Sequence, residues 1–341
     1  MNYDVTIGIP VYNSVEFIRR SMNSALNQTY SSIEFIVVDD GVNDGTMDVV
    51  CQFVKKHPRG NDIHIISHPI NQGVSVSRND IIKQAQGKYL YFMDSDDVIA
   101  ENTITLMMQH VRDKDAEIVF GSYERIEKTG MRTVYQYPFL QLLGEDELAC
   151  FAYRKYGGIQ ASACNYLVKT SVLREHCHRF IDSNYWEDLV FTFDLVTFIS
   201  RAVLLPNITY TYLCRDNSLS HYQRREQITK DEIMQNVRSV DYLKTTSSLL
   251  YNKVYFPNRC YLIAMTDLYI ACNILKREKT IVPPISRKEI RKLMRHPATW
   301  PQICRFKQSR LKNMVLYFIG KMPPSVCVMT ILCFAKMKKL M

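Results

Sequence analysis

The sequence is poor in glycine and lacks a glycine-rich phosphate-binding loop. Only 12 of its 341 residues are glycine, and the segment after the first expected strand reads Pro10-Val11-Tyr12-Asn13. Dinucleotide-dependent dehydrogenases carry G-x-G-x-x-G at that place, and nucleotidyltransferases need a glycine-rich loop there for the triphosphate. Neither class of enzyme fits this sequence.

Paired cysteines and a leader sequence are lacking as well. The ten cysteines have no C-x-x-C spacing, and a chain of this length does not need disulfide bonds to fold, so we expect reduced thiols. The adjacent His176, Cys177 and His178 do not predict a zinc site, because neighbouring side chains project in different directions and no second pair completes four ligands. The N-terminus has no basic region followed by a long apolar stretch, which favours a cytoplasmic location.

Long apolar runs are also lacking. The apolar stretches 315–319 and 326–335 contain at most about ten residues, whereas a membrane-spanning helix needs about 20. Residues 276–341 contain 16 Lys or Arg and 2 Asp or Glu, against 27 and 32 upstream. Basic helices with apolar residues lie on anionic membranes, so we expect peripheral contact with the cytoplasmic face of the inner membrane. The alternative is that these helices pack on the rest of the protein. No nucleic-acid recognition module is evident, and nucleic acid is not an expected partner.

Short apolar runs alternate with helical patterns in the N-terminal part of the chain. Runs with the composition of buried strands are found at 4–9, 33–38, 63–67 and 89–93. Asn13 and Glu16, three residues apart, predict the capped start of a helix that continues to Gln28. The alternation predicts an α/β fold with a Rossmann-like, mostly parallel sheet and helices on both faces. Helical spacing beyond about residue 224 predicts a helical C-terminal region, so we expect domains at 1–220 and 221–341.

Polar residues follow three of these runs. Pro10 to Asn13 follow the first run, Asp39 and Asp40 end the second, and Asp94-Ser95-Asp96-Asp97 follows the fourth. The carboxyl ends of parallel strands meet at one edge of a sheet, where ligands bind. Crowded carboxylates repel one another, and a divalent cation that bridges to phosphate oxygens relieves this repulsion. The pattern indicates a metal–diphosphate site; taken alone, an Asp-rich turn is equally typical of a helix cap.

The order and spacing of these segments resemble family 2 glycosyltransferases of bacterial polysaccharide and lipopolysaccharide synthesis, which have the GT-A fold. The resemblance rests on TIGIPVYNSVEFIRRSMNSALNQTYSSIEFIVVDDGVNDGT, NQGVSVSRN and QGKYLYFMDSDD, which cover residues 5 to 97 almost continuously. Two positions depart from the family pattern: Val42 stands where Ser is common, and Ile81 stands where Gly is common. Neither carries charge, so the resemblance still implies a GT-A sugar transferase.

The resemblance implies a binding site for a nucleoside-diphosphate sugar. Tyr12 would stack on uracil beside Pro10, and Asp40 would accept a hydrogen bond from the base. Arg78 would reach the base or the phosphates, and Asp94 would contact the ribose or a group next to the metal. The other residues expected at the donor are Asn13, Asp39, Ser95, Arg215, Ser218 and His221. The expected ligands of Mn²⁺ or Mg²⁺ are Asp96 and Asp97.

A second acidic segment, Glu187-Asp188, resembles the family's acidic pair at the start of a helix that supplies the catalytic base. In inverting transfer, a carboxylate takes the proton of the acceptor hydroxyl as its oxygen attacks the anomeric carbon. We assign Asp188 as the base, with Glu187 as the alternative. Two acids that merely stabilise a helix N-terminus are the structural interpretation of the same residues.

Together these features predict a metal-dependent, inverting hexosyltransferase. It would move a sugar from a nucleoside diphosphate, expected to be UDP, to a saccharide or lipid-linked saccharide acceptor in cell-surface polysaccharide synthesis. A non-catalytic sugar-nucleotide-binding or scaffold subunit that keeps the GT-A fold is the alternative. The presence of both Asp96 and Asp188 argues against it.

Overall fold

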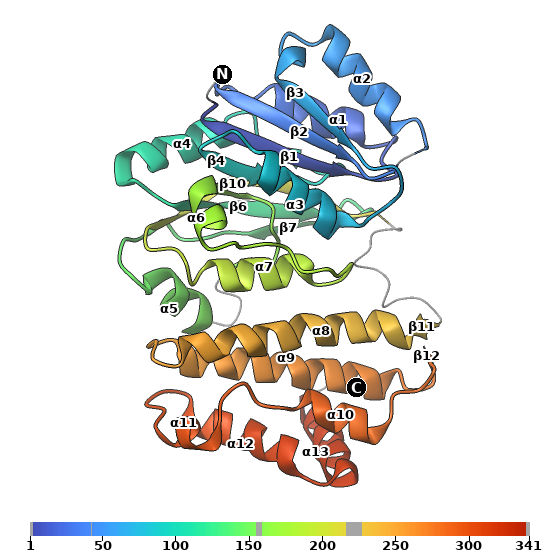
Figure 1. Cartoon of the computed structure of the whole chain (residues 1–341), viewed down its shortest axis with the longest axis vertical. Helices are drawn as coiled ribbons and strands as arrows, with labels where there is room; N and C mark the ends of the chain where they lie inside the picture. Colours follow the sequence, from blue (N-terminus) through green and yellow to red (C-terminus); the bar gives the residue numbers. More distant parts are fainter. Residues whose placement is uncertain (1–2, 42, 155–158, 216–226, 339–341) are drawn as a thin grey trace. The chain divides into compact units, whose positions relative to one another are not determined.

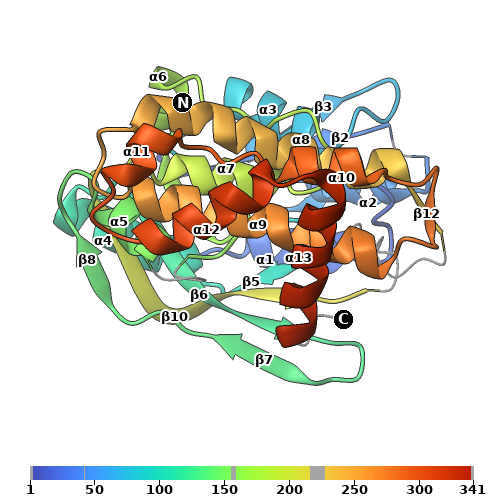
Figure 2. The ribbon, with the colours of Figure 1, turned by 90° about the horizontal axis from the view of Figure 1, so that it is seen from below.

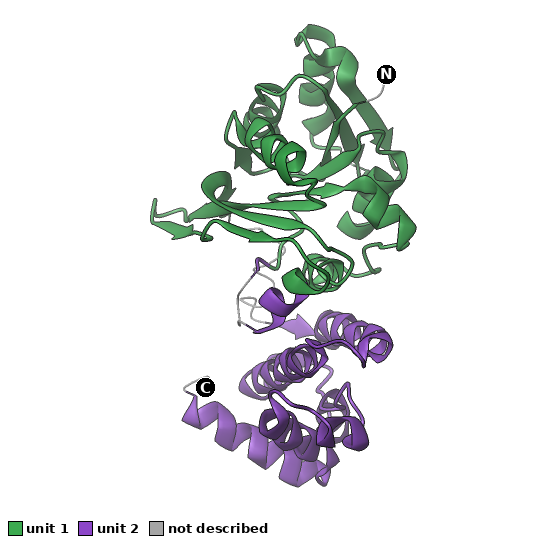
Figure 3. Ribbon diagram, turned by 90° about the vertical axis from the view of Figure 1, so that its left-hand side faces the viewer, with its two compact units in different colours: residues 1–148, 161–218 green, residues 149–160, 219–341 purple. Residues whose placement is uncertain are grey.

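The computed structural model describes residues 3–41, 43–154, 159–215 and 227–338. Contacts divide the chain into two compact units (Figure 3). Unit 1 contains Met1–Leu148 and Ala161–Ser218, and unit 2 contains Ala149–Gln160 and Leu219–Met341. The expected domain boundary between residues 220 and 221 lies outside the described residues. A short internal segment, Ala149–Gln160, groups with the C-terminal part of the chain, and no sequence pattern predicts this grouping.

Unit 1 is built on a ten-stranded mixed sheet (Figure 1). Its core strands are β1 (Val5–Val11), β2 (Ile33–Asp39), β3 (Ile63–Ser67), β4 (Tyr89–Phe92), β6 (Ile118–Ile126), β9 (Tyr166–Lys169) and β10 (Ala202–Leu213), and shorter strands are β5 (Val98–Ile99), β7 (Arg132–Tyr135) and β8 (Leu140–Leu142). The first four strands are parallel in the order β3-β2-β1-β4. β9 then runs antiparallel to both β4 and β6, and β10 lies parallel to β6. The four expected strands are therefore confirmed; β6 and β10 run in the same direction as they do, and β9 with the short strands β5, β7 and β8 runs opposite to them within the expected, mostly parallel sheet.

The strand order contains a change of direction between β1 and β4. The chain runs outward through β1, β2 and β3 and returns to place β4 on the other side of β1. Right-handed crossovers then put α1 (Ile18–Leu26) and α2 (Thr46–Lys56) on one face of the sheet and α3 (Val74–Gln84) on the other. Such a change of direction opens a crevice at the carboxyl ends of the strands, which is where ligands bind in open α/β sheets.

The helix after β1 begins later than expected. It starts at Ile18, and Asn13, the expected N-cap, lies before it with a left-handed backbone of φ 47°. Instead, the Ser14 carbonyl accepts hydrogen bonds from the backbone of Phe17 at 2.9 Å and of Ile18 at 2.8 Å. The capping box predicted for Asn13 and Glu16 was wrong. Residues 12–17 thus form a loop at the sheet edge.

Close packing of α3 on β1 explains one departure from the family pattern. A Cβ atom on Gly8 of β1 would overlap with Cγ2 of Ile81 on α3. The missing side chain at Gly8 leaves the space that Ile81 fills, and both residues are buried. The larger residue at position 81 therefore needs no wider spacing between helix and sheet.

Unit 2 is helical, as expected for the C-terminal region. Its longer helices are α8 (Lys230–Ser247), α9 (Phe256–Lys276), α12 (Arg310–Lys321) and α13 (Pro324–Met337), joined by α10 (Arg287–Leu293) and α11 (Trp300–Cys304) (Figure 2). α5 (Glu147–Arg154) joins this unit from Ala149 onward. α8 and α9 are tied by a buried ion pair, in which Lys244 Nζ lies 2.8 Å from Asp267 Oδ2. Among the described residues, no helix is long and apolar enough to cross a membrane.

Candidate functional site

The polar segments predicted from the strand ends lie at one edge of the sheet. Val11 is paired with Asp39 across β1 and β2, and the Asp40 amide donates to the Val11 carbonyl at 3.0 Å. On the other side of β1, the Met93 amide donates to the Gly8 carbonyl at 3.0 Å. The residues that follow β1, β2 and β4 therefore surround the point where the strand order changes direction.

Arg78 connects this edge with the acidic pair of α7 (Glu187–Leu195). Its Nη2 donates to Asp94 Oδ1 at 2.9 Å, and its Nη1 donates to Glu187 Oε1 at 2.9 Å. Arg78 is only 4% exposed, and its guanidinium lies 5.3 Å from the ring centre of Phe180. One buried cation thus holds two carboxylates that are 93 residues apart in the sequence. Both terminal nitrogens of Arg78 therefore have carboxylate partners, which gives Arg78 a positioning role; its expected contact with the base or the phosphates stays a prediction.

The carboxylates of the Asp94–Asp97 segment differ in their burial. Asp97 is buried; its Oδ2 accepts from the Tyr210 hydroxyl at 2.8 Å and its Oδ1 from the Leu213 amide at 2.9 Å. Asp94 and Asp96 are only partly buried. Asp97 therefore anchors the segment to β10, and the metal contact predicted for it has no support in this geometry.

The crowding predicted for these carboxylates is present. Burial, together with the charges of Asp96 and Asp94, raises the pKa of Asp97 well above its usual range. Burial and the charge of Asp94 also raise the pKa of Asp96. Arg215 opposes this effect, because its Nε lies 2.7 Å from Asp96 Oδ2. The guanidinium of Arg215 therefore forms an ion pair with Asp96, one of the two residues that the sequence predicted as metal ligands.

The loop after β1 is held from two sides. The hydroxyls of Ser14 and Ser95 lie 2.7 Å apart, which joins this loop to the Asp94–Asp97 segment. Asp44 Oδ2 accepts from the Val15 amide at 3.3 Å. Tyr12 projects from the loop with 46% of its surface exposed. Ser95 is buried, so it supports the loop and is not presented for a donor contact.

Asp40 has three hydrogen-bond partners within the protein. Its Oδ1 accepts from the Gln72 amide at 2.8 Å, its Oδ2 accepts from the Gly73 amide at 2.8 Å, and His68 Nδ1 lies 2.7 Å from Oδ1. The other ring nitrogen of His68 lies 3.0 Å from Asp80 Oδ2. Burial opposes charge on His68, but the hydrogen bonds to both carboxylates outweigh it and raise the pKa of this histidine. Asp40 therefore organises the loop before α3, and its predicted contact with a base stays a prediction.

The acidic pair of α7 is divided by its contacts. Glu187 is bound by Arg78, whereas Asp188 accepts only from the neighbouring Leu189 amide, at 2.7 Å, among the residues that the structure describes. Burial and the charge of Glu187 raise the pKa of Asp188 to about 7, although Arg78 opposes this rise. A carboxylate with a pKa near neutrality and an unengaged oxygen has the properties of a general base.

Most of the predicted residues lie at this edge, and several others were missed. Pro10 and Asp39, both partly buried, end β1 and β2, and Asn13 is exposed on the following loop. Ser218 and His221 lie outside the described residues, as does Val42. The residues that sequence reasoning missed are His68, Asp44 and Tyr210, which hold the expected residues in place. His68 follows β3 directly at the same sheet edge, and this position after a strand could have predicted that it belongs to the site.

The fit of a divalent metal was tested on the carboxylates themselves. No group of three or more His, Cys, Asp or Glu side chains within the described ranges converges on a single point. Mg²⁺ in phosphate-binding sites usually takes one or two protein carboxylates and completes its shell with phosphate oxygens and water. Asp94 and Asp96, partly buried and mutually repelling, fit that type of site.

Comparison with known proteins agrees with this geometry. The chain is 33% identical over 130 residues to the poly(ribitol-phosphate) beta-glucosyltransferase of Bacillus spizizenii, covering 37% of this chain and 20% of that protein. The chain spans less than half the length of the first curated relatives it matches.

Two solved structures share the fold. One is S. aureus TarS 1–349 in complex with UDP-GlcNAc, with a TM-score of 0.58 at 16% identity, covering 93% of this chain and 90% of that one. The other is the mannosyltransferase PcManGT from Pyrobaculum calidifontis in complex with GDP-Man and Mn²⁺, with a TM-score of 0.53 at 15% identity, covering 96% and 88%. At these identities the likeness establishes the GT-A-type α/β fold.

The sequence model described as glycosyl transferase family 2 matches residues 6–176, which is half of the chain. That segment contains the loop after β1, the Asp39-Asp40 pair, Arg78 and Asp94–Asp97. The chain therefore belongs to glycosyl transferase family 2.

Proposed function

We propose that this protein is an inverting glycosyltransferase that uses a nucleoside-diphosphate sugar. The observation that carries this proposal is that the two acids of the pair differ in their contacts. Glu187 is bound by Arg78, whereas Asp188 has no side-chain partner among the described residues, and its pKa is raised to about 7. A non-catalytic scaffold has no need for a partly buried carboxylate kept without a side-chain partner, because such a group costs free energy of folding.

The donor is proposed to bind at the carboxyl edge of β1, β2 and β4. The exposed ring of Tyr12 can stack on a nucleobase. We assign the hydrogen bond to the base to Asp39 in place of Asp40, because Asp40 is buried and held by three groups. UDP-GlcNAc and GDP-Man, bound by the two proteins with the same fold, represent the class of donor.

A divalent cation, Mn²⁺ or Mg²⁺, would be held by Asp94 and Asp96. When bound, it would neutralise charge on the diphosphate. Arg215 pairs with Asp96, so its guanidinium would lie beside the diphosphate of a bound donor. This arrangement would supply positive charge where the leaving group develops negative charge.

The proposed transfer is a single displacement. Asp188 accepts the proton of the acceptor hydroxyl, whose oxygen forms a bond to the anomeric carbon. The bond from that carbon to the diphosphate oxygen breaks, and the nucleoside diphosphate leaves with the electron pair. General-base assistance of this kind contributes a factor of about 10² to 10⁴.

The acceptor is proposed to be a saccharide or lipid-linked saccharide of the cell surface. The support is the relative named as a poly(ribitol-phosphate) beta-glucosyltransferase and the charge of +14 carried by residues 276–341. A positively charged region favours a phosphate-containing acceptor or a membrane that carries one.

The membrane contact is proposed to involve an apolar stripe on α12. Leu311, Val315 and Phe318 are 77%, 60% and 48% exposed and follow one another at helical spacing. The exposed cations Arg310 and Lys321 lie on the same helix. We call these three apolar residues the α12 stripe. Exposed apolar residues beside cations are suited to the interface of an anionic bilayer.

Replacement of the acidic pair tests the base. We expect Asp188→Asn to lower turnover by about 10² to 10⁴, because asparagine keeps the shape and loses the proton acceptor. Donor affinity should stay close to wild type, since the base acts only as the bond forms. Turnover of the wild type should rise as pH increases through about 7, because Asp188 must lose its proton to act. Glu187→Gln removes a charge that raises the pKa of Asp188, so it should move this pH limb downward.

These outcomes are measured as kcat and the donor KM over a pH series. A screen of UDP- and GDP-sugars for thermal stabilisation first identifies the donor, since a ligand at a hundred times its Kd adds about 2.7 kcal/mol of stability. Full activity in Asp188→Asn would contradict the proposal, and a loss confined to Glu187→Gln would move the base to the other member of the pair.

Asp96 and Asp97 should respond differently to replacement. Asp96→Ala should remove the dependence of nucleotide binding on Mn²⁺ and leave the melting temperature nearly unchanged, because it relieves crowding. Asp97→Ala should lower the free energy of unfolding by on the order of 2 kcal/mol, because the Tyr210 hydroxyl and Leu213 amide lose their acceptor. Titration calorimetry with and without Mn²⁺ and urea unfolding measure the two effects. Metal-dependent binding that survives Asp96→Ala would refute the metal assignment.

The α12 stripe is tested with phosphatidylcholine vesicles with and without phosphatidylglycerol. Replacing its three residues by serine should weaken binding to the anionic vesicles by at least about tenfold, because each withdrawn side chain contributes on the order of 1.5 kcal/mol. Substitution is preferable to deletion of the tail, because Leu316 and Ile319 of the same helix are buried in unit 2. The matched control replaces the exposed Leu249, Tyr251 and Val254. Equal loss in stripe and control variants would argue against the stripe.

A further inference from the structure

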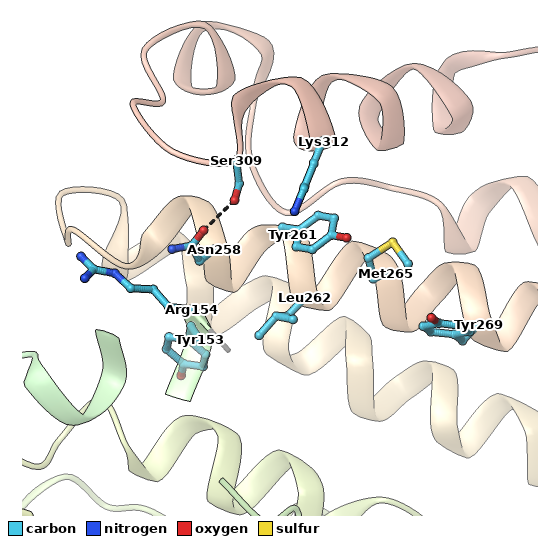
Figure 4. Close-up of a pocket in the computed structure, with 9 residues that line it drawn as sticks. All are labelled: Tyr153, Arg154, Asn258, Tyr261, Leu262, Met265, Tyr269, Ser309 and Lys312. Carbon is cyan, nitrogen blue, oxygen red and sulfur yellow. Dashed lines mark hydrogen bonds between the residues drawn. The ribbon is translucent and has the colours of Figure 1, made fainter. Parts of the chain in front are cut away.

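Unit 2 contains a cavity of about 250 Å³ that the proposed reaction does not use (Figure 4). Its walls come from α5, α9 and the start of α12. The lining includes three tyrosines, one arginine and one lysine, and no acidic residue: Tyr153, Arg154, Asn258, Tyr261, Leu262, Met265, Tyr269, Ser309 and Lys312. This composition differs from an apolar packing defect, because most of the lining side chains carry a polar group.

One wall is a face of α9 with two aromatic rings. Tyr261, Met265 and Tyr269 recur every four residues, and each is half-buried. Neither tyrosine hydroxyl has a hydrogen-bond partner within the described part of the chain. The wall therefore offers flat apolar surface together with two hydroxyls that are able to donate or accept.

The opposite side carries positive charge that no carboxylate neutralises. In Figure 4, Lys312 extends from α12 toward Tyr261, and its Nζ lies 5.0 Å from the centre of that ring. Within the described ranges, neither Lys312 nor Arg154 forms an ion pair. Lys244 in the same unit has two carboxylate partners, Asp241 and Asp267. Lys312 and Arg154 thus differ from Lys244, whose charge is neutralised by carboxylates within the unit.

The remaining walls are fixed before any ligand binds. The Tyr153 hydroxyl accepts from Arg259 Nη1 at 2.6 Å, and Ser309 Oγ donates to Asn258 Oδ1 at 2.7 Å. Side chains held in this way lose little conformational freedom when a ligand arrives, which favours binding. This part of the cavity wall is therefore preformed.

We infer that this cavity binds an anionic saccharide unit, either a sugar phosphate or a uronic acid. The ring of the sugar packs on Tyr261, whose face meets its C–H groups, and the tyrosine hydroxyls bond to sugar hydroxyls. Lys312 and Arg154 neutralise the phosphate or carboxylate. A volume of about 250 Å³ is near the lower end of ligand pockets and suits a single ring. That this unit belongs to the acceptor rests on the proposed transferase function; the binding itself does not.

The test is titration calorimetry of the full chain with four probes: glucose 1-phosphate, glucuronate, glucose and inorganic phosphate. The first two separate the phosphate from the carboxylate source, and the last two show whether ring and charge are both needed. We expect at least one charged sugar to bind at least fivefold more tightly than both glucose and inorganic phosphate. Equal binding of inorganic phosphate would reduce the site to a general anion contact and overturn the inference.

Variants locate the binding in the cavity. Lys312→Met and Tyr261→Ala should each weaken binding of the charged sugar at least fivefold, while Lys307→Met, an exposed lysine outside the cavity, should leave it unchanged. Tyr261→Phe keeps the ring and should bind better than Tyr261→Ala, which separates lost stacking from a fold defect. Unchanged binding in both Lys312→Met and Tyr261→Ala would overturn the inference. Nucleotide binding, measured on the same samples, should be unaffected, so failure of the cavity and failure of the donor site give different results.

Discussion

The candidate site depends on one buried cation that is shared by two carboxylates. Arg78 reaches Asp94 with one nitrogen and Glu187 with the other, each at 2.9 Å. Burying the charges of Arg78 and Glu187 costs several kcal/mol per ion, and only good geometry offsets that cost. The planar fork of a guanidinium provides this geometry and a lysine does not. The ion pairs of Arg78 therefore contribute little to the stability of the fold, and their main effect is to fix the positions of Asp94 and Glu187.

The consequences spread outward from this cation. Asp94 is held at the end of β4 and Glu187 at the start of α7, so Asp188 enters the site on a helix whose first residue is fixed. Because Glu187 is paired with Arg78, its carboxylate is held beside Asp188, and the negative charge of Glu187 contributes to the raised pKa of Asp188. The packing of Ile81 against Gly8 fixes α3, the helix that carries Arg78. The position of the base is thus connected to the core of the sheet.

The sequence predicted the parts of this site that depend on strand ends and missed those that depend on side-chain pairing. Continuous apolar runs located β1 to β4, and the polar residues after them were expected at one edge because parallel strands end together. Which carboxylates face inward could not be predicted: Asp97 and Asp40 are engaged by Tyr210 and His68, partners distant enough in sequence that no local pattern links them. The same holds for Asn13, whose left-handed backbone replaced a predicted helix start.

The affinity of the Arg78→Lys variant for its nucleoside diphosphate tests the positioning role most directly. Lysine keeps the charge but cannot hold both carboxylates. If Arg78 positions Asp94 and Glu187, the Kd measured by titration calorimetry without Mn²⁺ should change less than about threefold, while the melting temperature falls and turnover is largely lost. A Kd raised tenfold or more at an unchanged melting temperature would mean that Arg78 binds the donor itself, and would contradict this account.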